Sequence, residues 1–177
     1  MKRFVIRIVW ALVALTVVFM GGAYVLPDEA VVERHIDIAA PIGTVWPLVS
    51  DLRNFNRFSP WADLNSETHY SFEGPATGTG QKMTWSSANA EVGAGSQTIT
   101  AMTDQKRVET ELDFGGMGKA SVAFDLAPAD TGTHVIWRFS SPLNNPLERW
   151  LGLLYDRWIG ADYERGLTRL KTVAETP

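Results

Sequence analysis

The stretch PLERWLGLLYDRWIGADYERGLTRLKTVAE, residues 146–175, decides the fold of this chain. Apolar and small residues recur in it at steps of mostly three and four, namely Leu153, Gly160, Tyr163, Leu167, Leu170 and Ala174. This spacing predicts one long amphipathic helix from about Pro146 to Glu175, with Leu154 and Trp158 widening its apolar face. The asparagines that precede Pro146 suit a helix start. Such a helix needs an apolar surface on which to lie.

The chain ahead of this helix predicts that surface, because it alternates between apolar and polar residues. Residues 31–38 show the alternation first, and six further segments repeat it between residues 68 and 141. Turn-forming residues separate these segments. One apolar and one polar face per strand is typical of an antiparallel sheet covered on one side. We therefore expect about seven strands, with the C-terminal helix packed against their apolar face.

Two short helices are predicted between the first strand and the second. Pro41 is well placed to open a helix that runs through Val49. Pro47 lies inside it and is expected to shorten or split it. The following residues, 50–61, predict a second short helix and a loop.

The N-terminus predicts a membrane segment. Residues 8–26 form a run of 19 residues without a charge, which at about 1.5 Å per residue is long enough to cross a hydrocarbon layer of about 30 Å. Lys2, Arg3 and Arg7 precede it and Asp28 follows it, so the positive-inside rule places the domain outside the cytoplasm. A cleaved signal peptide shares this polarity, but no good small-x-small cleavage site precedes the domain. We expect residues 1–27 to be a single-pass anchor in the cell inner membrane and residues 28–177 to be one extracytoplasmic domain.

The charge balance excludes nucleic acid as a partner. The whole chain carries a net charge of −4, and without the three N-terminal cations the part from Asp28 onward holds 13 basic and 20 acidic residues, a net −7. An acidic domain without a basic stripe is unsuited to binding phosphate backbones. The chain has no cysteine, which removes disulfides, thiolate metal ligands and cysteine nucleophiles.

Motifs for catalysis, metal binding and cofactor binding are missing from the sequence. His35, His69 and His134 all fall on the polar side of their strands, and their spacing predicts no metal site. No G-x-S-x-G motif occurs. The glycines of residues 78–80 lack the third glycine and the following helix of a dinucleotide site. We therefore expect no catalytic residue, no metal and no cofactor.

Two features leave alternatives open. Asp156 and Asp162 lie beside the apolar stripe of the C-terminal helix, and a carboxylate facing an apolar cavity would have a raised pKa suited to acid–base work. The simpler interpretation makes them partners of Arg157, Arg165 or Arg169, or part of a solvated face. The glycine-rich residues 115–118 are either a plain hairpin turn or a loop that flexes at a cavity mouth.

Several segments, in their order, carry a family resemblance. They are IAAP at 38–41 leading to Val45 and Trp46, DLRNF at 51–55 with SPW at 59–61, GTG at 78–80 with Trp85, GT at 132–133, and DY at 162–163 in the closing helix. Together, over about residues 31–175, they resemble the START-like (SRPBCC) superfamily, in particular its polyketide-cyclase/dehydrase-type branch. The resemblance implies an α+β helix-grip fold, in which a curved antiparallel sheet wraps around the C-terminal helix and encloses a cavity. It also implies that the cavity binds a hydrophobic small molecule or lipid, often without any chemistry.

Apolar side chains on the predicted inner face are the candidate ligand-binding residues: Trp61, Met83, Trp85, Leu112, Phe114, Phe124, Trp137, Phe139, Trp158 and Tyr163. They form either a packed core or the wall of an open cavity, and an apolar wall with few polar groups is typical of a ligand site. The expected function is non-enzymatic binding of a hydrophobic small molecule or lipid beside the membrane. The alternatives are a cyclase or dehydrase-type enzyme that uses acid–base residues in the cavity, and a packed-core module that docks another envelope protein.

Overall fold

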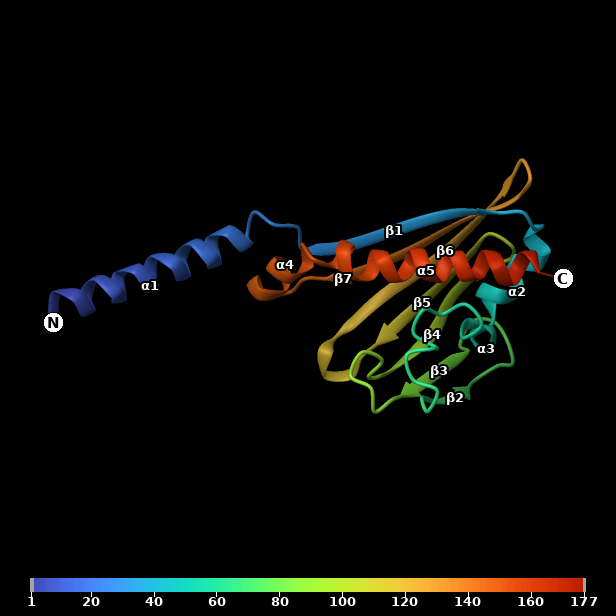
Figure 1. Ribbon diagram of the computed structural model, residues 1–177, viewed down its shortest axis with the longest axis horizontal. Helices are drawn as coiled ribbons and strands as arrows, with labels where there is room; N and C mark the ends of the chain where they lie inside the picture. The colour runs from blue at the N-terminus through green and yellow to red at the C-terminus, as the bar shows by residue number, and fades with distance from the viewer. Residues whose placement is uncertain (1, 177) are drawn as a thin grey trace.

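A computed structural model describes residues 2–176 of the chain. Its centre is one antiparallel sheet of seven strands in the order β1-β7-β6-β5-β4-β3-β2. The strands are β1 (Glu29–Ile38), β2 (His69–Glu73), β3 (Lys82–Ser86), β4 (Ala94–Thr103), β5 (Arg107–Asp113), β6 (Lys119–Ala129) and β7 (Gly132–Pro142). The sheet curves around the C-terminal helix α5 (Tyr155–Glu175), as Figure 1 shows. The predicted α+β helix-grip fold is confirmed.

Helix α1 (Lys2–Ala23) extends away from the rest of the molecule (Figure 1). It has 22 residues, and its most apolar stretch of 18 residues has a mean hydropathy of 2.3; none of this stretch is buried inside the protein. By length and composition it matches a membrane span or a signal sequence. Residues 24–28 are the only connection between α1 and β1 in the chain.

The C-terminal stretch forms two helices, so the prediction of one continuous helix is wrong. Helix α4 (Pro146–Gly152) begins with Asn145, whose side chain accepts a hydrogen bond from the Glu148 backbone N–H at 2.9 Å. A turn at residues 153–154 then separates α4 from α5. Gly152 favours this break, because glycine is a weak helix former and its backbone packs closely against the Leu143 side chain. Leu153, predicted on the buried face, is 55% exposed as a result.

Helix α2 (Ile42–Ser50) passes through Pro47 without a break, so that prediction was also wrong. Pro47 cannot donate the hydrogen bond that the Gly43 carbonyl would receive in a regular helix. Gly43 is exposed, so its free carbonyl can bond water instead. Asp51 then caps the short helix α3 (Leu52–Phe55), since its side chain accepts from the Arg53 backbone N–H at 2.9 Å.

A β-bulge in β4 changes the face that its later residues present. The pairing with β5 shifts between Ile99 and Ala101. Ile99 is buried, while Ala101 is exposed and Met102 is partly buried. Strict alternation would place Ala101 on the buried face with Ile99, but a bulge inserts one residue and reverses the pattern beyond it.

Arg34 fixes α5 on β1 from an unexpected position. It lies on the inward parity of β1, between Val32 and Ile36, where the strand pattern predicts an apolar residue. Its guanidinium donates to Asp156 Oδ1 at 2.9 Å and to Glu164 Oε1 at 2.7 Å. The group also lies directly against Gly160, where any side chain would collide with it. Because Gly160 has no side chain, the apolar stripe of α5 leaves room at this position for the Arg34 guanidinium.

We expect Arg34→Gln to raise the pKa of Asp156, because the hydrogen bond from Arg34 lowers it at present. The stabilisation from a lowered carboxylate pKa is present above the ordinary pKa of the group and is lost as the pH falls through the lowered value. In the variant, protonation of Asp156 at acid pH should therefore cause a smaller loss of folding stability than it does in the natural protein. An NMR titration of the side-chain carboxyl of Asp156 measures the shift. Arg157→Gln is the control, since Arg157 is exposed and Asp156 pairs with Arg34 instead; an equal shift in both variants would contradict the assignment.

Candidate functional site

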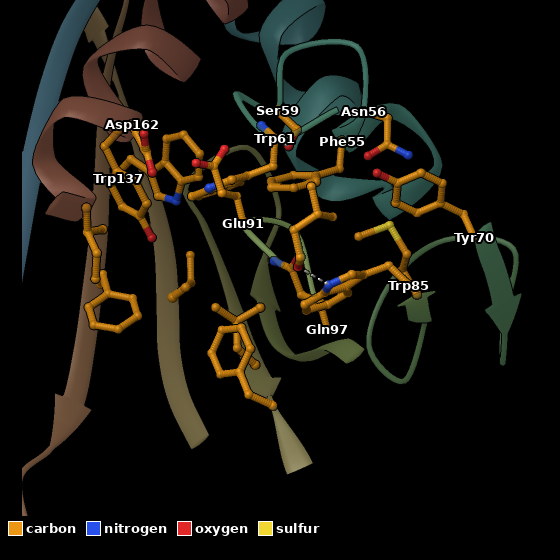
Figure 2. Close-up of a pocket in the computed structure, with 18 residues that line it drawn as sticks. Phe55, Asn56, Ser59, Trp61, Tyr70, Trp85, Glu91, Gln97, Trp137 and Asp162 are labelled. Atoms are coloured by element: carbon orange, nitrogen blue, oxygen red, sulfur yellow. Dashed lines mark hydrogen bonds between the residues drawn. The ribbon is translucent and has the colours of Figure 1, made fainter. Parts of the chain in front are cut away.

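A cavity of about 260 Å³ lies between the inner face of the sheet, α5 and the segment that follows α3 (Figure 2). Tyr70 and Trp85 lie on one side of it, and Trp137 and Asp162 lie on the other. Its volume is just below the range of about 300–1,000 Å³ that is usual for small-molecule sites. The cavity therefore has room for a small apolar molecule or for part of a larger one.

Most of the predicted ligand-binding residues border this cavity. Eight of the ten do so: Trp61, Met83, Trp85, Leu112, Phe114, Trp137, Phe139 and Tyr163. Phe124 is a packed core residue instead, 2% exposed and stacked on Trp137 with ring centroids 4.8 Å apart. Whether the eight residues contact a ligand stays a prediction.

Trp158 lies outside the cavity and is 51% exposed. It precedes Tyr163 by five residues, which places it roughly 140° around the helix from Tyr163 at 3.6 residues per turn. Ile159 precedes Tyr163 by four residues, so it shares the face of Tyr163 and borders the cavity. Stricter use of the helical repeat would have selected Ile159 in place of Trp158.

A cluster of aromatic rings around Trp137 makes one wall rigid. The Trp137 ring stacks on Tyr163 with centroids 3.8 Å apart and planes at 15°. Phe55, Phe58 and Trp61 meet Trp137 edge-on, with centroids 6.0 to 6.4 Å apart. Both stacked and edge-to-face pairs of this kind stabilise a core beyond simple burial. The wall is thus preformed.

Sequence reasoning missed Gln97, which is 2% exposed and borders the cavity. Gln97 lies two residues before Ile99 on β4, so strand alternation places both side chains on the inner face, and this was the available signal. Its Nε2 donates to Thr110 Oγ1 at 2.9 Å, while its Oε1 has no hydrogen-bond partner among the described residues. The Thr110 hydroxyl can donate as well as accept, so turning the amide over would still leave one of its polar atoms unpaired.

The indole Nε1 of Trp137 is a second buried polar atom without a partner in residues 2–176. Trp137 also borders the cavity. Leaving a buried polar group unpaired costs about 1–3 kcal/mol. Both residues border the cavity, but the two unpaired atoms have almost no accessible surface, so a ligand reaches either of them only if a side chain shifts.

Two phenols and two carboxylates, those of Tyr70, Tyr163, Asp162 and Glu91, belong to residues that border the cavity. Burial raises the pKa of Tyr70 and of Tyr163, so both phenols stay neutral. Asp162 borders the cavity but pairs with Arg165, as the simpler interpretation predicted. Asp156 pairs with Arg34 rather than with a neighbour on its own helix.

The histidines lie away from the cavity. His134 Nδ1 is 2.6 Å from Asp37 Oδ1, and its ring is 5.6 Å from that of His35. None of the three histidines is among the residues that border the cavity. Within residues 2–176, no group of three or more His, Asp or Glu side chains could hold a metal ion.

The glycine-rich segment forms a short turn at the edge of the site. Residues Gly115–Met117 make one 3₁₀ turn, and Gly115 and Gly118 take positive φ angles of 63° and 104°. Asp113 Oδ1 accepts from the Gly115 backbone N–H at 2.8 Å, and this bond lowers the pKa of Asp113. Met117 at the tip is 79% exposed. The neighbouring Phe114 borders the cavity.

Comparison with known proteins defines the class that this fold and cavity represent. The profile of the family described as "Polyketide cyclase / dehydrase and lipid transport" matches residues 29–175. The chain belongs to this family, as its START-like segments predicted. No curated protein sequence matches the chain significantly.

Solved structures with the same fold are distant in sequence. A protein from Chromobacterium violaceum superposes with a TM-score of 0.62 at 14% identity, over 84% of this chain and 99% of its own. A protein of unknown function from Staphylococcus aureus gives a TM-score of 0.64 at 12% identity, over 83% and 94% of the two chains. A protein of the dynemicin biosynthetic locus gives 0.58 at 18% identity, over 85% of this chain and 48% of its own. At these identities the likeness concerns the fold alone.

Proposed function

We propose that this protein is a membrane-anchored, non-enzymatic binder of a hydrophobic small molecule or of the apolar part of a lipid. The observation that carries the proposal is the cavity, whose wall is aromatic and aliphatic apart from a few polar groups. The family description, which includes lipid transport, supports it. The ligand would fill the apolar space and, after a side-chain shift, offer a polar group to Gln97 or to Trp137, whose unpaired atoms are otherwise a penalty to the fold.

Binding is favoured over catalysis by the state of the nearby titratable groups. General acid–base catalysis needs a group whose pKa lies near the working pH. The phenols of the partly buried Tyr70 and the buried Tyr163 have raised pKa values, Asp162 is paired with Arg165, and Glu91 is exposed.

Helix α1 supports the anchor in this proposal. Its 22 residues correspond to about 33 Å of helix, enough to cross a bilayer. Lys2, Arg3 and Arg7 at its beginning favour a cytoplasmic N-terminus. The domain from residue 28 would then lie on the extracytoplasmic side of the cell inner membrane.

The test is extraction of bound lipid from the full chain, purified in detergent and analysed by mass spectrometry. We expect an apolar molecule in a stoichiometric amount with the natural chain. Leu112→Trp should reduce it at least tenfold, because Leu112 is a wall residue and the larger ring fills the space. Ser121→Trp is the matched control, since it adds the same ring on the exposed face of β6. Circular dichroism shows whether both variants fold. A ligand that remains in the folded Leu112→Trp variant would place binding elsewhere.

A further inference from the structure

Five apolar side chains at one corner of the domain are exposed. They are Leu147 and Leu151 of α4, Leu153 and Leu154 of the turn, and Trp158 of α5, with exposures between 40% and 58%. We call this set the α4 corner. Single exposed apolar residues are ordinary, but a cluster of this kind marks a surface that contacts something apolar.

The α4 corner is attached directly to the end of α1. The Trp150 indole Nε1 donates to the Phe19 carbonyl at 3.1 Å, and the two rings stack with centroids 5.8 Å apart. Gly22 also packs closely against the Trp150 ring. In Figure 1, α4 lies beside the C-terminal end of α1. The end of α1, from Phe19 onward, is therefore in contact with the domain.

Arg149 adds a second attachment at the same place. Its guanidinium donates to the carbonyls of Ala23 at 3.3 Å and Leu26 at 3.4 Å. The last carbonyls of a helix have no partner within the helix, and a cation near them is favourable. Arg149 thus caps α1 from the domain side and fixes the position of α4 relative to it.

The length of α1 sets the depth of these contacts in a membrane. From residue 4 to residue 23, α1 has 20 residues and a length of about 30 Å, so it only just spans a hydrocarbon core of about 30 Å. In this placement the long Arg7 side chain reaches back to the cytoplasmic interface, and the last turn of α1 lies at the opposite one. Phe19 precedes the end of α1 by four residues, or about 6 Å. Trp150 would therefore lie in the interfacial layer, which tryptophan prefers.

Strand register places part of the cavity wall at the same end of the domain. Glu29, which follows α1, pairs with Pro142 at the end of β7. Further across the sheet, Ser121 pairs with Ser140 and Asp113 pairs with Lys119, so the β5–β6 turn lies at this end. The β3–β4 loop follows, because Ser96 pairs with Asp113 and Ser86 with Ala94.

These two loops carry cavity residues and an exposed apolar tip. Phe114 begins the β5–β6 turn and Val92 lies in the β3–β4 loop, and both border the cavity. Met117, at the tip of the β5–β6 turn, is 79% exposed. The end of the cavity near these residues thus faces the side from which α1 departs.

From these contacts we infer that the α4 corner lies in the interfacial layer of the bilayer that α1 crosses. The domain then rests on the membrane surface, with the β3–β4 and β5–β6 loops turned toward it, and the partner of the α4 corner is the lipid surface itself. This inference rests on the proposed membrane anchor, and it adds the orientation of the domain and the direction from which an apolar ligand arrives.

Single-cysteine labelling tests the inference without interference, because the chain has no cysteine of its own. The full chain is placed in phosphatidylcholine nanodiscs, some of whose lipids carry a nitroxide near the headgroup. A polarity-sensitive fluorophore is attached in separate proteins to Leu153→Cys, to Asp130→Cys and to Val13→Cys. Residue 130 is in the β6–β7 turn. The 11-residue strand β6 separates this turn, by about 33 Å, from the β5–β6 turn at the α1 end of the sheet.

We expect the label at 153 to be quenched at least threefold more strongly than the label at 130 and to emit at a shorter wavelength. The label at 13 reports whether α1 enters the bilayer. If the label at 13 emits from an apolar environment while those at 153 and 130 behave alike, the orientation is wrong and the anchor stands. If the label at 13 emits as in water, the anchor fails and the inference fails with it. Ligand extraction is a separate measurement and is unaffected by either result.

Discussion

Gly166→Ala is expected to lower the free energy of unfolding by about 1–3 kcal/mol, in the range usual for overpacked cores. Gly166 lies on the buried face of α5, and a Cβ there would be 2.6 Å from a carbon of the Trp137 ring. Trp137 is 1% exposed and has aromatic rings on several sides, so it has no room to move away. The substitution would push α5 off the sheet at the aromatic wall of the cavity.

Thermal unfolding of the full chain, followed by circular dichroism, measures this effect. For a domain of this size the expected loss corresponds to a fall in Tm of about 3–10 °C. Gly43→Ala is the matched control, because Gly43 is also helical but has no atom within 4 Å of its would-be Cβ. That variant should be unchanged or slightly more stable, since alanine favours helix more than glycine does. Equal destabilisation of both variants would show that the contact with Trp137 is not the cause.

The second large effect is expected from removing the polar pair in the cavity. In Gln97→Leu with Thr110→Val, both partners of a buried hydrogen bond become apolar groups of similar size. Replacing both partners in this way is close to neutral, and here it also removes an unpaired amide atom that costs about 1–3 kcal/mol. We therefore expect the ligand-free protein to be as stable as the natural one or more so.

Ligand affinity, in contrast to stability, should fall in the double variant. Losing one hydrogen bond of about 1.4 kcal/mol corresponds to roughly tenfold weaker binding. The measurement is titration of the extracted ligand against both proteins, compared with unfolding of the same samples. Thr103→Val is the control, since it removes an exposed hydroxyl from the end of β4. If the double variant were less stable and bound the ligand unchanged, the polar pair would be a structural feature of the sheet.

Alternation and helical repeat were sufficient to predict the seven strands, the closing helix and eight of the 18 residues that border the cavity. They work because a side chain in a strand points to one face or the other, and one face here is buried. Trp85, Trp137 and Phe139 were placed correctly by this rule alone.

The errors arose where tertiary contacts override local pattern. Trp158 is a separate case, since it was counted into the apolar stripe although it lies roughly 140° around α5 from Tyr163. Arg34 lies on an apolar parity because Asp156 and Glu164 of a distant helix receive its charge. The inward position of Gln97 could be read from the strand pattern, but its unpaired amide oxygen could not, since that depends on Thr110 in the neighbouring strand.

The attachment of α4 to α1 also affects how such a protein would search for its ligand. Only residues 24–28 separate α1 from β1, and five residues reach at most about 18 Å even when fully extended. With α1 in a bilayer, the domain cannot travel into bulk water, so its encounters take place by lateral diffusion in a layer a few nanometres thick. The relevant quantity for occupancy is then the mole fraction of ligand in the membrane rather than its concentration in solution. A sparingly soluble compound, nearly absent from water, would still meet this cavity often.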